Sequence, residues 1–161
     1  MANTFTWANA IAFAALRIKE RGSIMFANCS MGGMQFAMPD VCLTPIPSPA
    51  GPIPTPIPYP NTAMLPMAIP PTCSMKHFIS MMPAHNMATM VPMSMGDNAG
   101  AIGGVMSGMM MGPARSMMGS VKVFTGGLPA TKMLSPALQN MTNAPTGMTL
   151  APSQVKVLIM S

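Results

Sequence analysis

One proline-rich segment, residues 39–61, restricts the possible folds of this chain more than any other. It contains nine of the chain's 19 prolines, in the sequence PDVCLTPIPSPAGPIPTPIPYPN. Proline fixes φ near about −65° and lacks a backbone donor, so the segment can form neither a helix nor a central strand. Ile46, Ile53, Ile57 and Tyr59 still place apolar side chains along it. We predict an extended, stiff strap that packs its isoleucines onto a small β core; the alternative is a polyproline linker or a ligand for a proline-binding module.

A shortage of charge is the second constraint. Charged residues make up 7% of the 161 residues, while 24 methionines supply much of the 50% hydrophobic content. Soluble proteins usually contain about a quarter of charged residues. The surface must therefore consist of Ser, Thr, Asn, Gly and exposed apolar groups, and such a surface usually functions by being buried against a partner. The length fits one domain, or one domain with a tail.

The net charge of +5 does not indicate a nucleic-acid-binding protein. It arises because only three acidic residues, Glu20, Asp40 and Asp97, stand against eight scattered basic residues. Nucleic-acid binders show a clustered basic patch with aromatic side chains for stacking, and this sequence has neither.

The cysteines and the N-terminal region bear on the compartment in which the chain folds. Cys29, Cys42 and Cys73 are odd in number and lack CxxC spacing, so they predict no disulfide framework and favour folding in a reducing cytosol. No stretch reaches the roughly 18 apolar residues of a membrane span. The first basic residues follow the N-terminal apolar run, whereas a secretory signal places them before it.

Local patterns predict one helix and several short strands. Residues 4–21 show apolar residues at helical spacing, with cations in the last turns and Gly22 to end the helix. Residues 1–24 are thus an upstream extension or docking helix, or else an ordinary helix packed on the core. Strands are expected at 25–29 and 34–38 around a Gly32-Gly33 turn, and at 154–160.

An internal repeat predicts two hairpins. Residues 76–87 (KHFISMMPAHNM) align with residues 122–133 (KVFTGGLPATKM), and five of the twelve positions are identical. Each copy is expected to form a short strand, a turn and a second strand that begins at Pro-Ala. Duplicated hairpins indicate a small, repetitive, all-β body. The glycine- and methionine-rich residues 96–119 between the copies lack the GK[ST] or GxGxxG context of a phosphate-binding loop.

The sequence offers little material for catalysis. Asp40 and Asp97 could meet in space, but both stand in contexts that favour turns. No Ser or Cys has a GxSxG or comparable setting beside a candidate base, so we expect no enzyme.

A structural zinc site is a more plausible chemistry. Cys73, His77 and His85 fall within thirteen residues, and Cys42 could join them in space. Thiolate and imidazole are the usual ligands of tetrahedral zinc. We therefore expect His85, Cys73, His77 and Cys42 to bind any structural zinc ion. The alternative is that Cys73 is a small buried residue and His77 lies on a strand face.

The chain resembles PAAR-like spike-tip proteins of contractile secretion systems, type VI above all. Four groups of motifs support the resemblance, and together they cover about residues 25–158. They are FAMPDVCLTP (36–45) with PIPYPN (56–61); MPAHN (82–86); GDNAG (96–100) with GGVMSG and GPAR; and SVKVFTGGLPATKM (120–133) with NAPTGM and PSQVKVL.

The resemblance implies a fold, a partner and a metal. It implies a cone of short β-strands whose flat base seats on a trimeric β-helical spike protein, VgrG in type VI systems. Zinc near the point is usually held by His and Cys in such proteins. His85 matches the histidine of MPAHN, while Ser116 and Ala144 stand where relatives often have His and Cys.

Together these observations predict an all-β, cone-shaped repetitive domain at residues 25–161, with a proline-rich strap and an N-terminal helical extension at 1–24. The resemblance implies a structural protein that caps and sharpens a VgrG-type trimer, aids membrane puncture, and contacts effectors or an adaptor. It would reside in the bacterial cytoplasm before firing and then be secreted. The alternatives are the delivery module of a toxin, a small toxin, or a metal-binding protein that uses the methionines, which are densest at 109–111.

Overall fold

The computed structural model describes residues 24–160, and this part of the chain is predominantly β, as predicted. The described elements are β1 (Ile24–Phe26), β2 (Met34–Ile46), β3 (Ile53–Met64), η1 (Leu65–Met67), η2 (Pro70–Thr72), β4 (Ser74–Ile79), β5 (Met82–Ala84), β6 (Met90–Val91), β7 (Gly103–Gly104), β8 (Ala114–Ser116), β9 (Phe124–Thr125), β10 (Leu128–Pro129), β11 (Pro136–Gln139), β12 (Ala144–Ala151) and β13 (Leu158–Met160). The helix predicted at 4–21 lies outside the described residues. Among the described residues, no helix has the length and apolar character to cross a bilayer.

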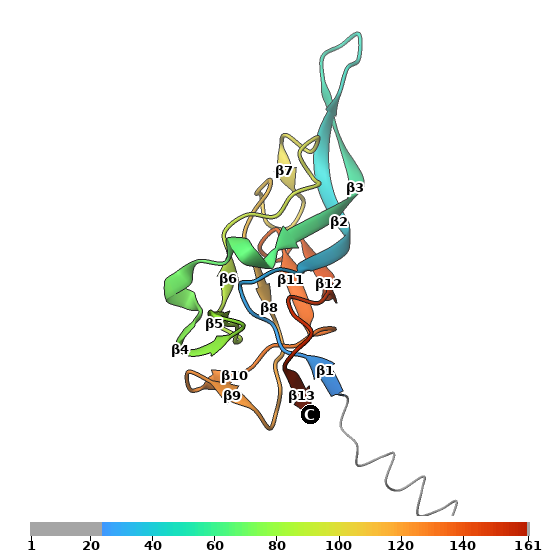
Figure 1. The fold of residues 1–161 in the computed structure, drawn as a ribbon. Coiled ribbons are helices and arrows are strands. Elements are labelled where there is room, and N and C mark those ends of the chain that lie inside the picture. Colours follow the sequence, from blue (N-terminus) through green and yellow to red (C-terminus); the bar gives the residue numbers. More distant parts are fainter. Residues whose placement is uncertain (1–23, 161) are drawn as a thin grey trace, which may run out of the picture.

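The proline-rich segment forms a long hairpin rather than a strap on the core. β2 and β3 pair antiparallel from Met34 and Met64 to Ile46 and Ile53, and their turn projects at one end of the molecule (Figure 1). Ile46 is 42% exposed and Ile53 is 54% exposed. The prediction that the isoleucines pack onto a core was therefore wrong for these two, because the hairpin extends beyond the body it grows from.

The spacing of the prolines explains how they fit into a strand. Pro54, Pro56, Pro58 and Pro60 recur at every second residue of β3, which is the repeat at which successive backbone donors of a strand point to the same side. β3 is an edge strand of its sheet, whereas β2, which contains Pro39 and Pro45, is an inner strand, so the prediction that the segment forms no central strand was wrong for β2. The residues between the prolines can therefore donate to β2, while the prolines occupy the positions whose donors would face outward.

A seven-stranded sheet forms the body, in the order β3-β2-β12-β11-β8-β6, with β7 paired to β2. Its buried residues are mostly alanine and polar: the larger apolar cluster contains Leu65 and Val91 beside three alanines and Cys73. None of the described methionines is buried. The sequence analysis missed β8, β11 and β12, because small and polar buried residues produce no hydrophobic alternation.

Three two-stranded antiparallel sheets, here called the arms, complete the fold: β4–β5, β9–β10 and β1–β13. The first two are the predicted repeat, and the structure confirms both. Each turns through two residues with positive φ, Ser80-Met81 in one and Gly126-Gly127 in the other, as a two-residue type I′ turn requires. The third arm joins the two ends of the described chain. Its strand β13 is shorter than the predicted 154–160.

The arms are held together by a closed ring of backbone hydrogen bonds. In the inner circle, the segment after each Pro-Ala or Phe-Ala pair donates to the next segment: Asn28 N to Thr131 O at 3.0 Å, Thr131 N to His85 O at 3.2 Å, and His85 N to Asn28 O at 3.0 Å. A second, outer set of bonds runs around the ring in the opposite sense, from donors two residues later to acceptors two residues earlier: Ser30 N to Pro83 O at 3.1 Å, Met87 N to Pro129 O at 3.1 Å, and Met133 N to Phe26 O at 2.8 Å. The ring thus relates the arms by a pseudo-threefold axis. The arms form the end of the molecule opposite the β2–β3 turn (Figure 1).

Candidate functional site

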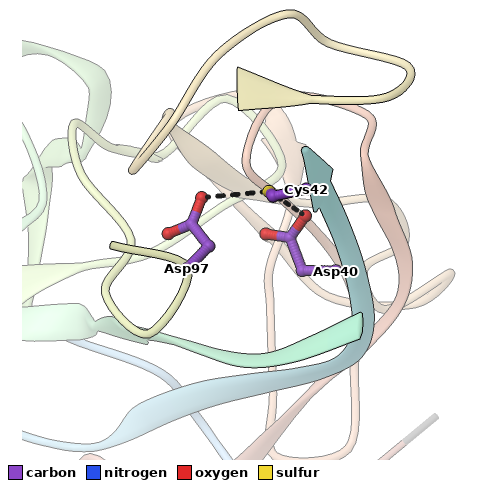
Figure 2. A group of neighbouring side chains, drawn as sticks. All are labelled: Asp40, Cys42 and Asp97. Carbon is purple, nitrogen blue, oxygen red and sulfur yellow. Dashed lines mark hydrogen bonds between the residues drawn. The ribbon is translucent and has the colours of Figure 1, made fainter. Parts of the chain in front are cut away.

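Both acidic residues of the described chain lie in one buried cluster with Cys42. Asp40, Cys42 and Asp97 are each 0% exposed. Asp40 and Cys42 are two residues apart on β2, so their side chains point to the same face, and Asp97 reaches them from the loop between β6 and β7 (Figure 2). The Cys42 Sγ lies 3.5 Å from Asp40 Oδ1 and 3.7 Å from Asp97 Oδ2. The expectation that the two aspartates serve only turns was therefore incomplete, since they meet in the interior.

Close backbone approach brings the Asp97 loop onto the hairpin. A Cβ on Gly100 would lie 2.2 Å from the Cys42 Cβ. Gly96 adopts φ +137°, and a Cβ there would lie 2.0 Å from the Pro60 carbonyl oxygen. Only glycine fits this geometry, so these two residues of GDNAG place Asp97 against β2 and β3.

Three asparagine side chains donate to the carboxylates. Asn61 Nδ2 lies 2.5 Å from Asp40 Oδ2, and Asn143 Nδ2 donates to Asp40 Oδ1. Asn140 Nδ2 lies 2.8 Å from Asp97 Oδ2 and 3.3 Å from Asp40 Oδ1. The network joins β2, β3, the Asp97 loop and the turn between β11 and β12, and it therefore holds together segments far apart in sequence.

Backbone donors fix the orientation of two of these amides. Gly112 N donates to Asn140 Oδ1 at 3.0 Å, and Met106 N donates to Asn143 Oδ1 at 2.8 Å. The amide nitrogens of Asn140 and Asn143 must therefore face the cluster, where they compensate the buried carboxylates.

The Asp40–Cys42–Asp97 group could hold a metal ion, because one ligand atom from each residue lies within 4.8 Å of the others. A bound cation would require Cys42 to lose its proton and coordinate as a thiolate. It would also compete with the asparagine donors for the two carboxylates. Burial, followed by the charges of Asp40 and Asp97, raises the pKa of Cys42 to about 12. At neutral pH the thiol therefore keeps its proton and acts as a hydrogen-bond donor to the carboxylates.

Comparison with known families assigns the chain. A family model described as Toxin PAAR-like domain matches residues 33–146, more than half of the sequence. The chain belongs to the Toxin PAAR-like domain family. Neither the search of curated proteins nor the search of solved structures gives a match. The match confirms the PAAR-like resemblance. It begins just before β2 and ends within β12, so the β1–β13 arm of this PAAR-like protein lies outside it.

The four zinc ligands predicted from the sequence lie in three places. Cys42 belongs to the aspartate cluster. His85 Nε2 lies 2.9 Å from Ser30 Oγ, which lies 3.9 Å from Cys73 Sγ. His77 Nδ1 lies 3.0 Å from Ser74 Oγ and accepts from Gly126 N at 3.3 Å. Cys73 and His77 line one surface cavity, but these four residues form no common tetrahedral set and so do not fit the predicted zinc ion. A role for His85 as a zinc ligand stays a prediction.

The cysteines match the sequence analysis in a second respect. Cys29, Cys42 and Cys73 are all free and all buried. The interpretation of Cys73 as a small buried residue agrees with its 6% exposure.

His85 predicts a pH dependence of folding. Burial lowers its pKa from 6.5 to about 4. In the unfolded chain the imidazole binds a proton below about pH 6.5, whereas in the fold it stays neutral until about pH 4, so unfolding takes up a proton in this window. The free energy of unfolding should fall by about 3 kcal/mol between pH 6.5 and 4. Urea denaturation at a series of pH values measures this slope. The His85→Gln variant should lack the His85 part of the slope, and an identical slope in both proteins would contradict the assignment.

Proposed function

We propose that this PAAR-like protein is the structural tip of a type VI secretion spike, and that its three arms seat on the blunt end of a trimeric VgrG-type spike protein. The pseudo-threefold ring is the observation that supports this best. A single chain that faces a homotrimer can contact all three subunits alike only if it presents three equivalent surfaces. The described residues do so at the end where the arms gather.

Equivalent residues of the arms expose equivalent apolar groups. Phe78, Phe124 and Leu158 occupy the same position in the three arms, since they pair with Pro83, Pro129 and Phe26 of the ring. Their exposures are nearly equal, at 58%, 55% and 52%. Large apolar side chains left exposed at three symmetric positions favour burial against a partner with the same symmetry.

The opposite end supports passage through a membrane. Residues 41–75 and 98–114 contain no Asp, Glu, Lys or Arg, and an ionised side chain is costly within a bilayer. The alternating prolines of β3 also remove donors that an open edge strand would present to lipid. We infer that the charge-free β2–β3 turn leads the spike through a target membrane, after assembly in the bacterial cytoplasm and secretion through the apparatus.

A structural role is favoured over a catalytic one. The Ser30–His85 pair has the 2.9 Å separation of a nucleophile and its base, but Ser30 is 8% exposed and His85 2% exposed, which keeps substrates away. The second candidate function follows from the family description: a delivery module for a toxin, in which effectors or an adaptor bind the sides of this domain. A third, metal binding, rests on the Asp40–Cys42–Asp97 group, and metal analysis of the purified chain in complex with the trimer tests whether zinc is held there.

Binding of the purified chain to a VgrG-type trimer tests the proposed function. We expect one chain per trimer by size-exclusion chromatography with light scattering. The Phe78→Asp, Phe124→Asp, Leu158→Asp triple variant should bind at least about a hundredfold more weakly, because each change puts a carboxylate into an apolar contact.

The matched control for this variant is Met106→Asp, since Met106 is 74% exposed but lies outside the arms. We expect the control to bind like the wild type. Equal binding by the triple variant and the wild type would show that the arms do not form the interface.

A further inference from the structure

The β1–β13 arm corresponds to the two copies of the repeat, although its two strands come from opposite ends of the described chain. Each of the three arms contains a lysine at the same position. In each arm, a lysine stands two residues before the residue that pairs with the ring position Phe26, Pro83 or Pro129. The corresponding sequences are Met75-Lys76-His77-Phe78, Val121-Lys122-Val123-Phe124 and Val155-Lys156-Val157-Leu158. Because the pairing registers are the same, Lys76, Lys122 and Lys156 occupy equivalent positions about the pseudo-threefold axis.

The three lysines are available to a partner. Each is exposed, and within residues 24–160 none of their ammonium groups has a hydrogen-bond or ion-pair partner. Each also follows an exposed apolar residue, with Met75 at 55%, Val121 at 77% and Val155 at 69% exposure.

The described surface has no acidic side chain that could pair with the three lysines in place of a partner protein. Asp40 and Asp97 are the acidic residues of this part of the chain, and both are fully buried with asparagine donors around them. The lysines therefore form a cationic ring on a surface without opposing charge, and complementarity requires anions on whatever covers it.

We propose that the lysine ring contacts one acidic side chain from each of the three subunits of the spike trimer, at the edge of the apolar contact made by the arms. This inference rests on the proposed function and specifies the chemistry of the partner, namely a trimer end that carries an Asp or Glu once per subunit. Apolar contacts tolerate small rotations of the tip about the threefold axis. Three ion pairs form together only when each lysine faces the acidic side chain of one subunit. The lysines thus orient the tip on the trimer and speed its docking.

Charge-reversal variants measured against a VgrG-type trimer test the lysine ring. Lys76→Glu, Lys122→Glu and Lys156→Glu should each weaken binding by about threefold in 0.1 M salt, and the triple variant by about 30-fold, because exposed ion pairs are individually weak. The three single variants should be alike, since their positions are equivalent. In 1 M salt the difference between the triple variant and wild type should shrink to less than about twofold.

Arg115→Glu is the matched control, because Arg115 is exposed on β8 and the change alters the net charge by the same amount. We expect its affinity to equal that of the wild type. Wild-type affinity in the triple lysine variant at 0.1 M salt overturns the lysine ring while leaving the seating of the arms intact. A loss in Arg115→Glu equal to that of each single lysine variant overturns it as well. Failure of the wild-type chain to bind the trimer at any salt concentration overturns the proposed function itself, and the lysine ring with it.

Discussion

Replacing Asp40 with alanine is expected to cost about 3–6 kcal/mol of unfolding free energy, enough to unfold much of the chain at 37 °C. Asp40 accepts hydrogen bonds from the side chains of Asn61, Asn140 and Asn143 and from the Cys42 thiol. The three amide nitrogens would keep their second acceptors, which are Ser94 Oγ for Asn61, Asp97 Oδ2 for Asn140 and the Val41 carbonyl oxygen for Asn143. Each amide would still lose one of its two acceptors, and a buried N–H group left unsatisfied costs about 1–3 kcal/mol. Urea denaturation followed by circular dichroism measures the loss, or soluble yield where the variant fails to fold.

Asp97→Asn is the matched control within the same cluster. Asp97 Oδ2 accepts from Asn140 Nδ2 and from Met111 N, and an asparagine oxygen can still accept both bonds. Asp97 Oδ1 has no hydrogen-bond partner among the described residues, so converting it to an amide nitrogen removes no bond, but it buries new N–H donors at a cost of about 1–3 kcal/mol. The control should therefore lose less stability than Asp40→Ala. Equal losses would mean that buried charge, rather than the count of donors, determines the stability of the cluster.

Replacing Gly96 with alanine is expected to destabilise the fold by about 3–5 kcal/mol. The new Cβ would lie 2.0 Å from the Pro60 carbonyl oxygen and 3.2 Å from the Asn61 Cα, both in the backbone of β3. The φ of +137° is also one that alanine rarely adopts. The Asp97 loop must therefore move away from β3, which disrupts the two backbone hydrogen bonds between Thr62 and Met95 beside Gly96. Chemical denaturation and near-ultraviolet circular dichroism measure the change.

Gly108→Ala separates the two causes of this loss. Gly108 also has positive φ, at +65°, but nothing lies within 4 Å of a Cβ built there. We expect it to lose only about 1 kcal/mol, the usual strain of a left-handed residue. A Gly96→Ala variant as stable as Gly108→Ala would show that the loop is not pressed against the hairpin.

Local sequence patterns predicted the arms well and the sheet poorly. The β4–β5 and β9–β10 arms follow from an alignment at constant offset, because each is a short-range hairpin with its own turn. The edge position of β3 follows from its prolines. The inner strands β8, β11 and β12 carried no such signal, since a core of alanine, asparagine and glutamine has no hydrophobic period.

The candidate site was only partly visible in the sequence. The sequence left open that Asp40 and Asp97 meet in space but favoured turn roles for both. Asparagine is also common in turns, so nothing distinguished Asn61, Asn140 and Asn143 from surface residues. The predicted zinc set grouped His85, Cys73 and His77 because they are neighbours in sequence. In the structure, neighbouring residues of a strand and its turn point into different surroundings, and Cys42 belongs to another cluster.

The family, the β character and two of the three arms could be predicted from the sequence, because they depend on residues close together along the chain. The third arm, the aspartate cluster and the equivalence of Lys76, Lys122 and Lys156 became apparent only in the folded structure. The third arm pairs β1 with β13, whose residues Ile24 and Met160 stand at opposite ends of the described chain. Such pairing depends on the closure of the whole chain around the pseudo-threefold ring, which a local pattern of residues does not encode.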